Sequence, residues 1–283
     1  MSLDLSIERW TRDVALRQWS RDDAALSDLG ALLPDPIARE RSLAEVHRLD
    51  LSLFVVFEEA ALRVSGALVR RAPGPQAMAF AAQQTLDEAR HHEIFARRLE
   101  VSTAAWGTRA ATGDILIPPL RRFLDLCYEV ADRGDFVEGL VLTNLVLEGM
   151  AYPLYAYEER YWAPVDPYLA RLIASAFADE TRHVAFGASL VKRALDDDAA
   201  ARARVQRLTD DARQVMGEVF AYYVRKFVGL FDAVARRHRA LFAAADFQPG
   251  RRLADTPYQD QIACIRQSID TEHARLLARA GLS

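Results

Sequence analysis

The 283-residue sequence has little cysteine, little net charge and few long apolar runs. Its two cysteines do not make a disulfide framework, so we expect a reducing, cytoplasmic setting. The net charge of −4 provides no global basic surface, and nucleic acid is therefore not an expected partner. The first residues mix charged with apolar side chains and lack the apolar core of a signal peptide.

One stretch, residues 139–157, is long and apolar enough to be mistaken for a membrane span. Asn144, Glu148 and Pro153 interrupt it, and no comparable stretch occurs elsewhere. A helix that is apolar all round is also what the centre of a large bundle requires, so we expect a core helix and no membrane. Glu148 then needs a partner or a metal ion, because a buried charge must be compensated.

The sequence predicts helices from end to end and no strand. Proline and glycine mark the breaks between them. The expected helices cover residues 5–19, 38–71, 74–102, 115–132, 135–160, 165–195, 200–241 and 256–279. We expect one all-α domain over residues 1–283.

A short motif occurs twice, as DEARH at 87–91 and DETRH at 179–183. Each copy sets a glutamate three residues before a histidine, Glu88 before His91 and Glu180 before His183. Residues three apart share one face of an α-helix, so the two members of each pair can bind the same metal ion.

Each motif is preceded by a lone glutamate at a similar distance: Glu58 is 30 residues before Glu88, and Glu148 is 32 before Glu180. Two Glu-x-x-His helices and two single-glutamate helices form the site of di-iron and di-manganese carboxylate proteins. Four carboxylates balance two divalent ions, and this donor set suits iron or manganese with positions open for dioxygen. The predicted ligands are Glu58, Glu88, His91, Glu148, Glu180 and His183.

Helix geometry separates Glu58 from its neighbour Glu59. Glu58 shares its face with an almost wholly apolar stripe, whereas Glu59 has Arg63 one turn later, as surface pairs do. Glu58 also matches Glu148 in the other half. We therefore expect Glu58 to be the ligand, and Glu59 to be exposed or to lie beside the ligands.

The second motif likewise selects His91 over His92, because Val184 stands where a counterpart of His92 would be. The repeated aspartates, Asp87 and Asp179, are expected to orient the opposing histidines. Such a hydrogen bond selects the tautomer that leaves the other ring nitrogen available as a ligand.

The pattern FEEAA–DEARH–LEGMA–DETRHVAFG resembles the ferritin-like superfamily, in the branch near ribonucleotide reductase small subunits and R2-like ligand-binding oxidases. The resemblance covers about residues 40–195. It implies a four-helix bundle core with flanking helices, a homodimer, and a di-iron or manganese–iron centre that activates O2 as co-substrate. It also implies that Glu148 is the catalytic carboxylate that shifts between terminal and bridging modes.

The chain departs from these relatives at four positions. Phe95 stands where reductase subunits carry a radical tyrosine. Thr143 and Ala61 stand where the ligand-binding oxidases form a tyrosine–valine crosslink. Ala176 replaces the seventh ligand of arylamine N-oxygenases. These departures indicate a plain six-ligand site and argue against a reductase role.

What remains is an oxidase or oxygenase acting on a small organic molecule, with an external electron donor where the substrate supplies no electrons. We favour N-oxidation in secondary metabolism, hydrazine to azoxy or amine oxidation, as in the azoxy-forming step of the valanimycin type. One alternative is an R2-like oxidase with a Mn/Fe centre acting on a fatty-acid-like or other C–H substrate. A second is a non-catalytic helical scaffold or an iron-storage protein.

Overall fold

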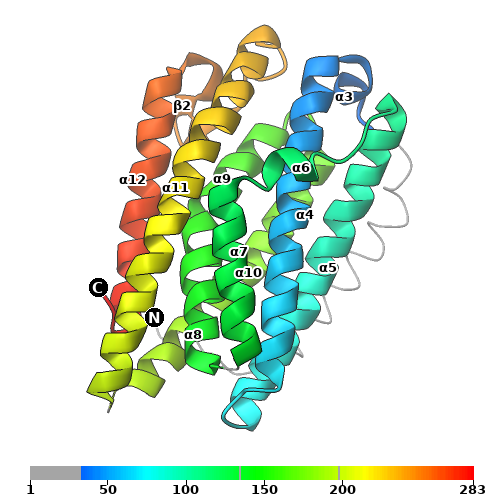
Figure 1. Cartoon of the computed structure of the whole chain (residues 1–283). Coiled ribbons are helices and arrows are strands. Elements are labelled where there is room, and N and C mark those ends of the chain that lie inside the picture. Colours follow the sequence, from blue (N-terminus) through cyan, green and yellow to red (C-terminus); the bar gives the residue numbers. More distant parts are fainter. Residues whose placement is uncertain (1–32, 134, 197) are drawn as a thin grey trace.

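A computed structural model describes residues 33–133, 135–196 and 198–283, so the helix expected at 5–19 lies outside the described residues. Long helices with nearly parallel axes make up the molecule (Figure 1). The all-α expectation is confirmed, apart from one very short strand pair.

Two helical pairs form the core. The first is α4 (Arg41–Val69) with α5 (Pro75–Trp106), which pack closely along their length. The second is a composite run packed against α10 (Pro167–Leu195). That run consists of α8 (Phe136–Leu140), the π-helix η2 (Val141–Glu148) and α9 (Gly149–Trp162).

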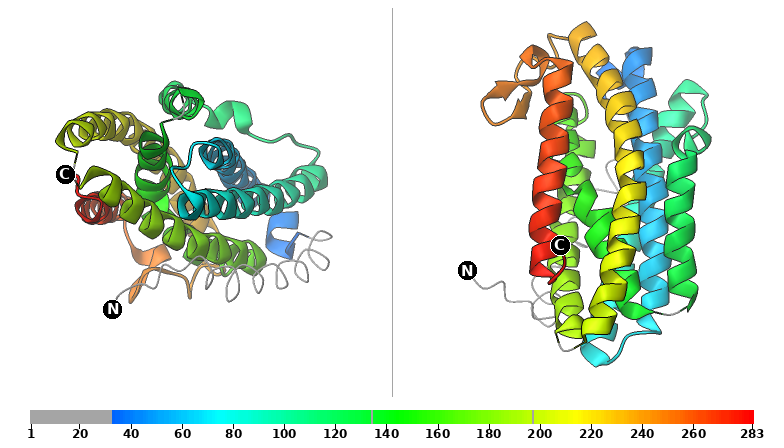
Figure 2. Two further views of the ribbon diagram at one scale, coloured as in Figure 1. Left: turned by 90° about the horizontal axis from the view of Figure 1, so that it is seen from below. Right: turned by 60° about the vertical axis from the view of Figure 1, so that its left-hand side comes forward.

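The remaining elements cover this core. Helices α11 and α12 lie side by side against it, and a small hairpin projects at one end (Figure 2). The covering helices are α3 (Asp35–Arg39), α6 (Thr112–Ile115), α7 (Pro118–Arg133), α11 (Ala199–Arg237) and α12 (Tyr258–Arg279). The hairpin joins β1 (Asp246–Gln248) to β2 (Arg251–Arg252), and η3 (Leu253–Asp255) follows.

Helix ends follow from local chemistry. Asp166 accepts a hydrogen bond from the Leu169 N–H at 3.0 Å, and Pro167 occupies the first position of α10. Gly107 ends α5 in a left-handed conformation, with φ 59°. These signals set the length of the helices that carry the two motifs.

A buried polar cluster joins three helices of the core. The carboxylate of Asp166 lies 3.0 Å from His47 Nε2 of α4 and accepts a 2.6 Å hydrogen bond from Arg98 of α5. Although burial opposes its ionisation, these partners lower the pKa of Asp166 to about 2. The cluster ties the start of α10 to α4 and α5 and so helps to set their relative positions.

The structure corrects several sequence expectations. The helix expected at 135–160 contains a π segment, and the helix expected at 38–71 is broken at Glu40. The short hairpin was missed, because two or three residues per strand show no alternation. The apolar stretch is buried from residue 139 to residue 150, and no described helix is long and apolar enough to cross a membrane.

Candidate metal centre

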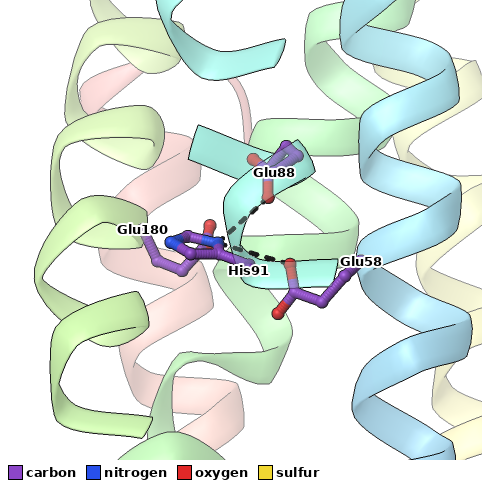
Figure 3. A group of neighbouring side chains, drawn as sticks. All are labelled: Glu58, Glu88, His91 and Glu180. Carbon is purple, nitrogen blue, oxygen red and sulfur yellow. Dashed lines mark ion pairs between the residues drawn. The ribbon is translucent and has the colours of Figure 1, made fainter. Parts of the chain in front are cut away.

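Four helical elements direct buried acidic and histidine side chains to one point in the middle of the bundle. Figure 3 shows Glu58 from α4 and Glu180 from α10 facing the Glu88 and His91 pair of α5. Glu148, the last residue of the π segment, and His183 of α10 lie on the other side of Glu88 and Glu180. The structure thus brings all six predicted residues together.

These residues form two overlapping groups, and within each group the donor atoms lie within 4.8 Å of one another. The first consists of Glu58, Glu88, His91 and Glu180, and the second of Glu88, Glu148, Glu180 and His183. Glu88 and Glu180 belong to both. Such an arrangement would hold two ions, one at each group, with Glu88 and Glu180 available to both.

Distances within the first group fit ligands around one ion. His91 Nδ1 lies 3.4 Å from Glu58 Oε2, 3.3 Å from Glu88 Oε2 and 3.5 Å from Glu180 Oε1. Donor atoms that are each about 2.1 Å from one ion stand roughly 3 Å apart. His91 Nδ1 and Glu88 Oε2 are buried and make no hydrogen bond within the described residues. A cation between them would satisfy both atoms.

The repeated aspartates lie where the sequence predicts. Asp179 Oδ2 is 3.2 Å from His91 Nε2, and Asp87 Oδ2 is 3.3 Å from His183 Nε2. Arg90 holds Asp179 from the outer side of the bundle. When Nε2–H donates to the aspartate, the lone pair of Nδ1 points towards the glutamates, which suits a metal ligand.

Two amides that the sequence reasoning missed hold Glu148. Gln84 Nε2 donates to Glu148 Oε1 at 2.7 Å, and Asn144 Nδ2 donates to Glu148 Oε2 at 3.1 Å. Asn144 also donates to Gln84 Oε1 at 3.1 Å, so the two amides support each other. Gln84 lies one turn before Glu88 on α5, and this spacing is the one signal by which it could have been found.

Burial of so many carboxyls shifts their protonation. It raises the pKa of Glu58 to about 8 and that of Glu148 well above its usual range. Burial opposes ionisation of Glu88 as well, but the facing histidines lower its pKa. Burial also opposes protonation of His91 and His183, yet the surrounding carboxylates raise both pKa values well above the ordinary value. Without metal, protons on the carboxyls and histidines offset the negative charge of the cluster. Two divalent cations would neutralise this charge instead.

The alternative residues lie outside both groups. The side chain of Glu59 is 45 % exposed and pairs with Arg63, as expected for a surface residue. His92 is only partly buried and belongs to neither group. Glu58 and His91 are therefore the residues that the fold brings to the centre.

An apolar cavity adjoins the centre, and its empty space, together with the open solvent at its mouth, is about 560 Å³. Tyr155 lines it and donates a 3.1 Å hydrogen bond to Glu58 Oε1. The apolar lining consists of Leu53, Phe54, Phe57, Ala61, Leu147, Ala151, Leu154, Met216 and Phe220, and the acidic lining of Glu58, Glu148, Glu180 and Glu158.

Residues 45–198, more than half of the chain, match the family model for methane/phenol/alkene hydroxylases. The chain belongs to the methane/phenol/alkene hydroxylase family. The matched residues include both motifs and all six residues of the centre. No curated protein sequence matches the chain.

Solved structures confirm the ferritin-like bundle of this hydroxylase-family protein. An R2-like ligand-binding oxidase reconstituted with a Mn/Fe cofactor superposes with a TM-score of 0.61 at 16 % identity, over 95 % of this chain and 94 % of that one. A Synechococcus protein with aldehyde deformylating oxidase activity gives 0.54 at 19 % identity, over 86 % and 99 %. At such identities the likeness establishes the fold alone.

Proposed function

We propose that this protein uses two iron ions and O2 to hydroxylate a small, largely apolar organic substrate held in the cavity beside the centre. The observation that carries the proposal is the pair of overlapping carboxylate–histidine groups at the wall of an apolar cavity. Membership of the hydroxylase family supports it. The net reaction is R–H + O2 + 2 e⁻ + 2 H⁺ → R–OH + H2O, so a two-electron donor from outside the chain is required.

Bound iron ions would supply the reduction of O2 beside the substrate. The chain's own residues hold the ions, orient the substrate and keep water out of the cavity. The residues that line this space include Phe54 and Phe57 of α4, Leu154 of α9, and Met216 and Phe220 of α11. We assign the movable carboxylate to Glu148, because neutral amides hold it and it is not shared between the two groups.

N-oxidation of a hydrazine or an amine, which we favour only because features of the better-known relatives are absent, stays a prediction. So does the alternative of a Mn/Fe centre acting on a fatty-acid-like chain, which the apolar cavity would also accommodate. A scaffold or storage role predicts either no bound metal or metal without substrate oxidation.

The first test is metal content after loading the full chain with Fe(II) and Mn(II) together. Two irons per chain support the proposal, and one manganese with one iron favours the Mn/Fe alternative. Glu58→Gln should lose metal, whereas the matched surface variant Glu59→Gln should keep it. A folded protein that retains no metal would overturn the proposal.

The second test is a substrate panel of alkanes, alkenes, phenols, amines and hydrazines with a chemical reductant and O2. Mass spectrometry should detect one added oxygen atom, and use of ¹⁸O2 should show that it comes from dioxygen. Oxygen on carbon supports hydroxylation, and oxygen on nitrogen supports N-oxidation.

A further inference from the structure

Two of the four glutamates at the centre face both histidines. Glu88 Oε2 lies 3.3 Å from His91 Nδ1, and Glu88 Oε1 lies 3.1 Å from His183 Nδ1. Glu180 is placed in the same way, with Oε1 3.5 Å from His91 Nδ1 and Oε2 3.4 Å from His183 Nδ1. Each of these two carboxylates can therefore give one oxygen to each ion.

Glu58 presents only one oxygen to the ion site. Its Oε2 lies 3.4 Å from His91 Nδ1, and Figure 3 shows the other oxygen directed away from this histidine. That second oxygen, Oε1, accepts the 3.1 Å hydrogen bond from the hydroxyl group of Tyr155. The hydrogen bond thus holds Glu58 in the orientation in which Oε2 alone faces the ion site.

Packing fixes the ring of Tyr155, which is buried. The ring lies 5.9 Å from that of Phe177 at an interplanar angle of 17°, and 5.6 Å from that of Phe54 at 65°. Contacts with two aromatic rings restrict its rotation. Tyr155 also lies seven residues, or about two turns, after Glu148 in the same helical run. The run that supplies one ligand therefore also supplies the hydroxyl group that holds another.

The cavity meets the centre at its carboxylates. Of the described residues, Glu58, Glu148 and Glu180 line the cavity, whereas neither histidine of the centre does. A molecule that enters from the cavity must therefore approach an ion on the side of these carboxylates. A carboxylate can bind a metal ion through one oxygen or through both. If Glu58 bound through both, it would occupy one more coordination position on the cavity side.

We propose that Tyr155 is a positioning residue that restricts Glu58 to one metal-binding oxygen and so keeps a coordination position of the adjacent ion open towards the cavity. This inference rests on the di-iron centre of the proposed function. Without the phenol group, Glu58 Oε1 is free to turn towards the ion and to close that position.

Tyr152, three residues earlier on α9, provides a matched comparison. Its ring also contacts Phe177, at 4.4 Å between centroids, but its hydroxyl group lies 3.1 Å from Thr181 Oγ1. The two tyrosines thus share an aromatic neighbour and differ in the partner of the hydroxyl group. Replacing either one by phenylalanine removes a single oxygen atom and keeps the ring.

The test is azide binding to the full chain after loading with Fe(II) and oxidation in air. Azide binds ferric iron at an open coordination position, and a visible charge-transfer band reports the binding without any organic substrate. We expect Tyr155→Phe to keep two irons per chain and to bind azide at least tenfold more weakly than the unaltered chain. Tyr152→Phe should keep both the iron content and the azide affinity.

Unchanged azide affinity in Tyr155→Phe, an equal loss in Tyr152→Phe, or loss of iron from Tyr155→Phe would overturn the proposal. So would an unaltered di-iron chain that binds no azide, because no open position would then face the cavity. A folded chain that binds no iron would overturn both this proposal and the proposed function. A selective loss of azide binding in Tyr155→Phe, in a chain that oxidises no substrate, would refute the hydroxylation and support the role of Tyr155.

Discussion

Glu148 differs from the other carboxylates of the centre in what holds it. Gln84 and Asn144 bind its two oxygens, whereas a histidine Nδ1 lies 3.4 Å from Glu58 and 3.1 Å from Glu88. Neutral amides stabilise a carboxylate without neutralising it. This environment lets Glu148 change its position at lower cost than a carboxylate held in an ion pair.

Loss of the Gln84 amide should destabilise the protein. Gln84→Leu keeps most of the side-chain volume but removes the donor to Glu148 Oε1 and one of the two acceptors of the Asn144 amide. We expect a loss of about 1–3 kcal/mol in the free energy of unfolding, measured by denaturant titration without added metal. The control Gln76→Leu, exposed on the same helix, should change stability by less than about 0.5 kcal/mol. Equal effects of both changes would contradict the role of the amide.

Shared and unshared ligands should differ in metal stoichiometry. Glu88 belongs to both groups, whereas His91 belongs to one. Because each ion needs several donors, Glu88→Ala is expected to lose both irons and His91→Ala to lose one. Metal analysis per folded chain measures the difference. Two irons retained by Glu88→Ala would show that this carboxylate is not shared.

Asp50 should make stability depend on pH. Its pKa in the folded state, about 7, lies above the ordinary value of 3.8, so folding favours the protonated form. The stability from this preference is fully present below about pH 4 and is lost as pH rises to about 7. The difference in unfolding free energy between the unaltered chain and Asp50→Asn should therefore fall over this window. Thermal melts at several pH values measure it, and a constant difference would refute the shift.

At the scale of elements, the position of Glu148 depends on how the π segment packs against α10. Gly187 of α10 faces Asn144, and a Cβ atom at this glycine would lie 2.6 Å from Asn144 Cβ. The contact is too close for any side chain. A glycine at this crossing therefore allows Asn144 to reach both Gln84 and Glu148.

Gly187→Ala and Gly66→Ala should have opposite effects on stability. Gly66 of α4 has room, since its added Cβ would meet only Thr85 Cγ2 at 3.7 Å. Gly66→Ala should stabilise the protein by up to about 1 kcal/mol through helix propensity. Gly187→Ala should destabilise it by about 1–3 kcal/mol through overpacking. Denaturant titrations of both variants measure the contrast, and stabilisation by Gly187→Ala would disprove the close packing.

The duplicated motif and the helical periodicity predicted the helices and the six residues that the structure brings together. A π segment could not be predicted, because a widened stretch of helix inside a largely apolar run leaves the hydrophobic pattern almost unchanged. Gln84 and Asn144 carry no motif, since an amide becomes a carboxylate partner only through tertiary packing. The hydrogen bond from Tyr155 to Glu58 likewise joins residues far apart in the sequence.

At the scale of the whole molecule, two similar helical pairs enclose one charged centre that neither could bury alone. Helix α11 adds Met216 and Phe220 to the cavity wall, and α12 packs against α9 and the π segment. Without cations, the centre holds four acidic side chains and two histidines away from water. The fold therefore buries the negative charge of four carboxylates, which two divalent ions would neutralise.

Metal loading should therefore stabilise the entire protein. Ions that bind only the folded state add RT ln(1 + [L]/Kd), about 2.7 kcal/mol for each site at a concentration of 100 Kd. Differential scanning calorimetry under anaerobic conditions should show a higher Tm with Fe(II) than without, and a chelator should reverse it. Glu88→Ala should show no such rise, because it removes a donor common to both groups. An equal rise in this variant would mean that iron stabilises the chain from another place.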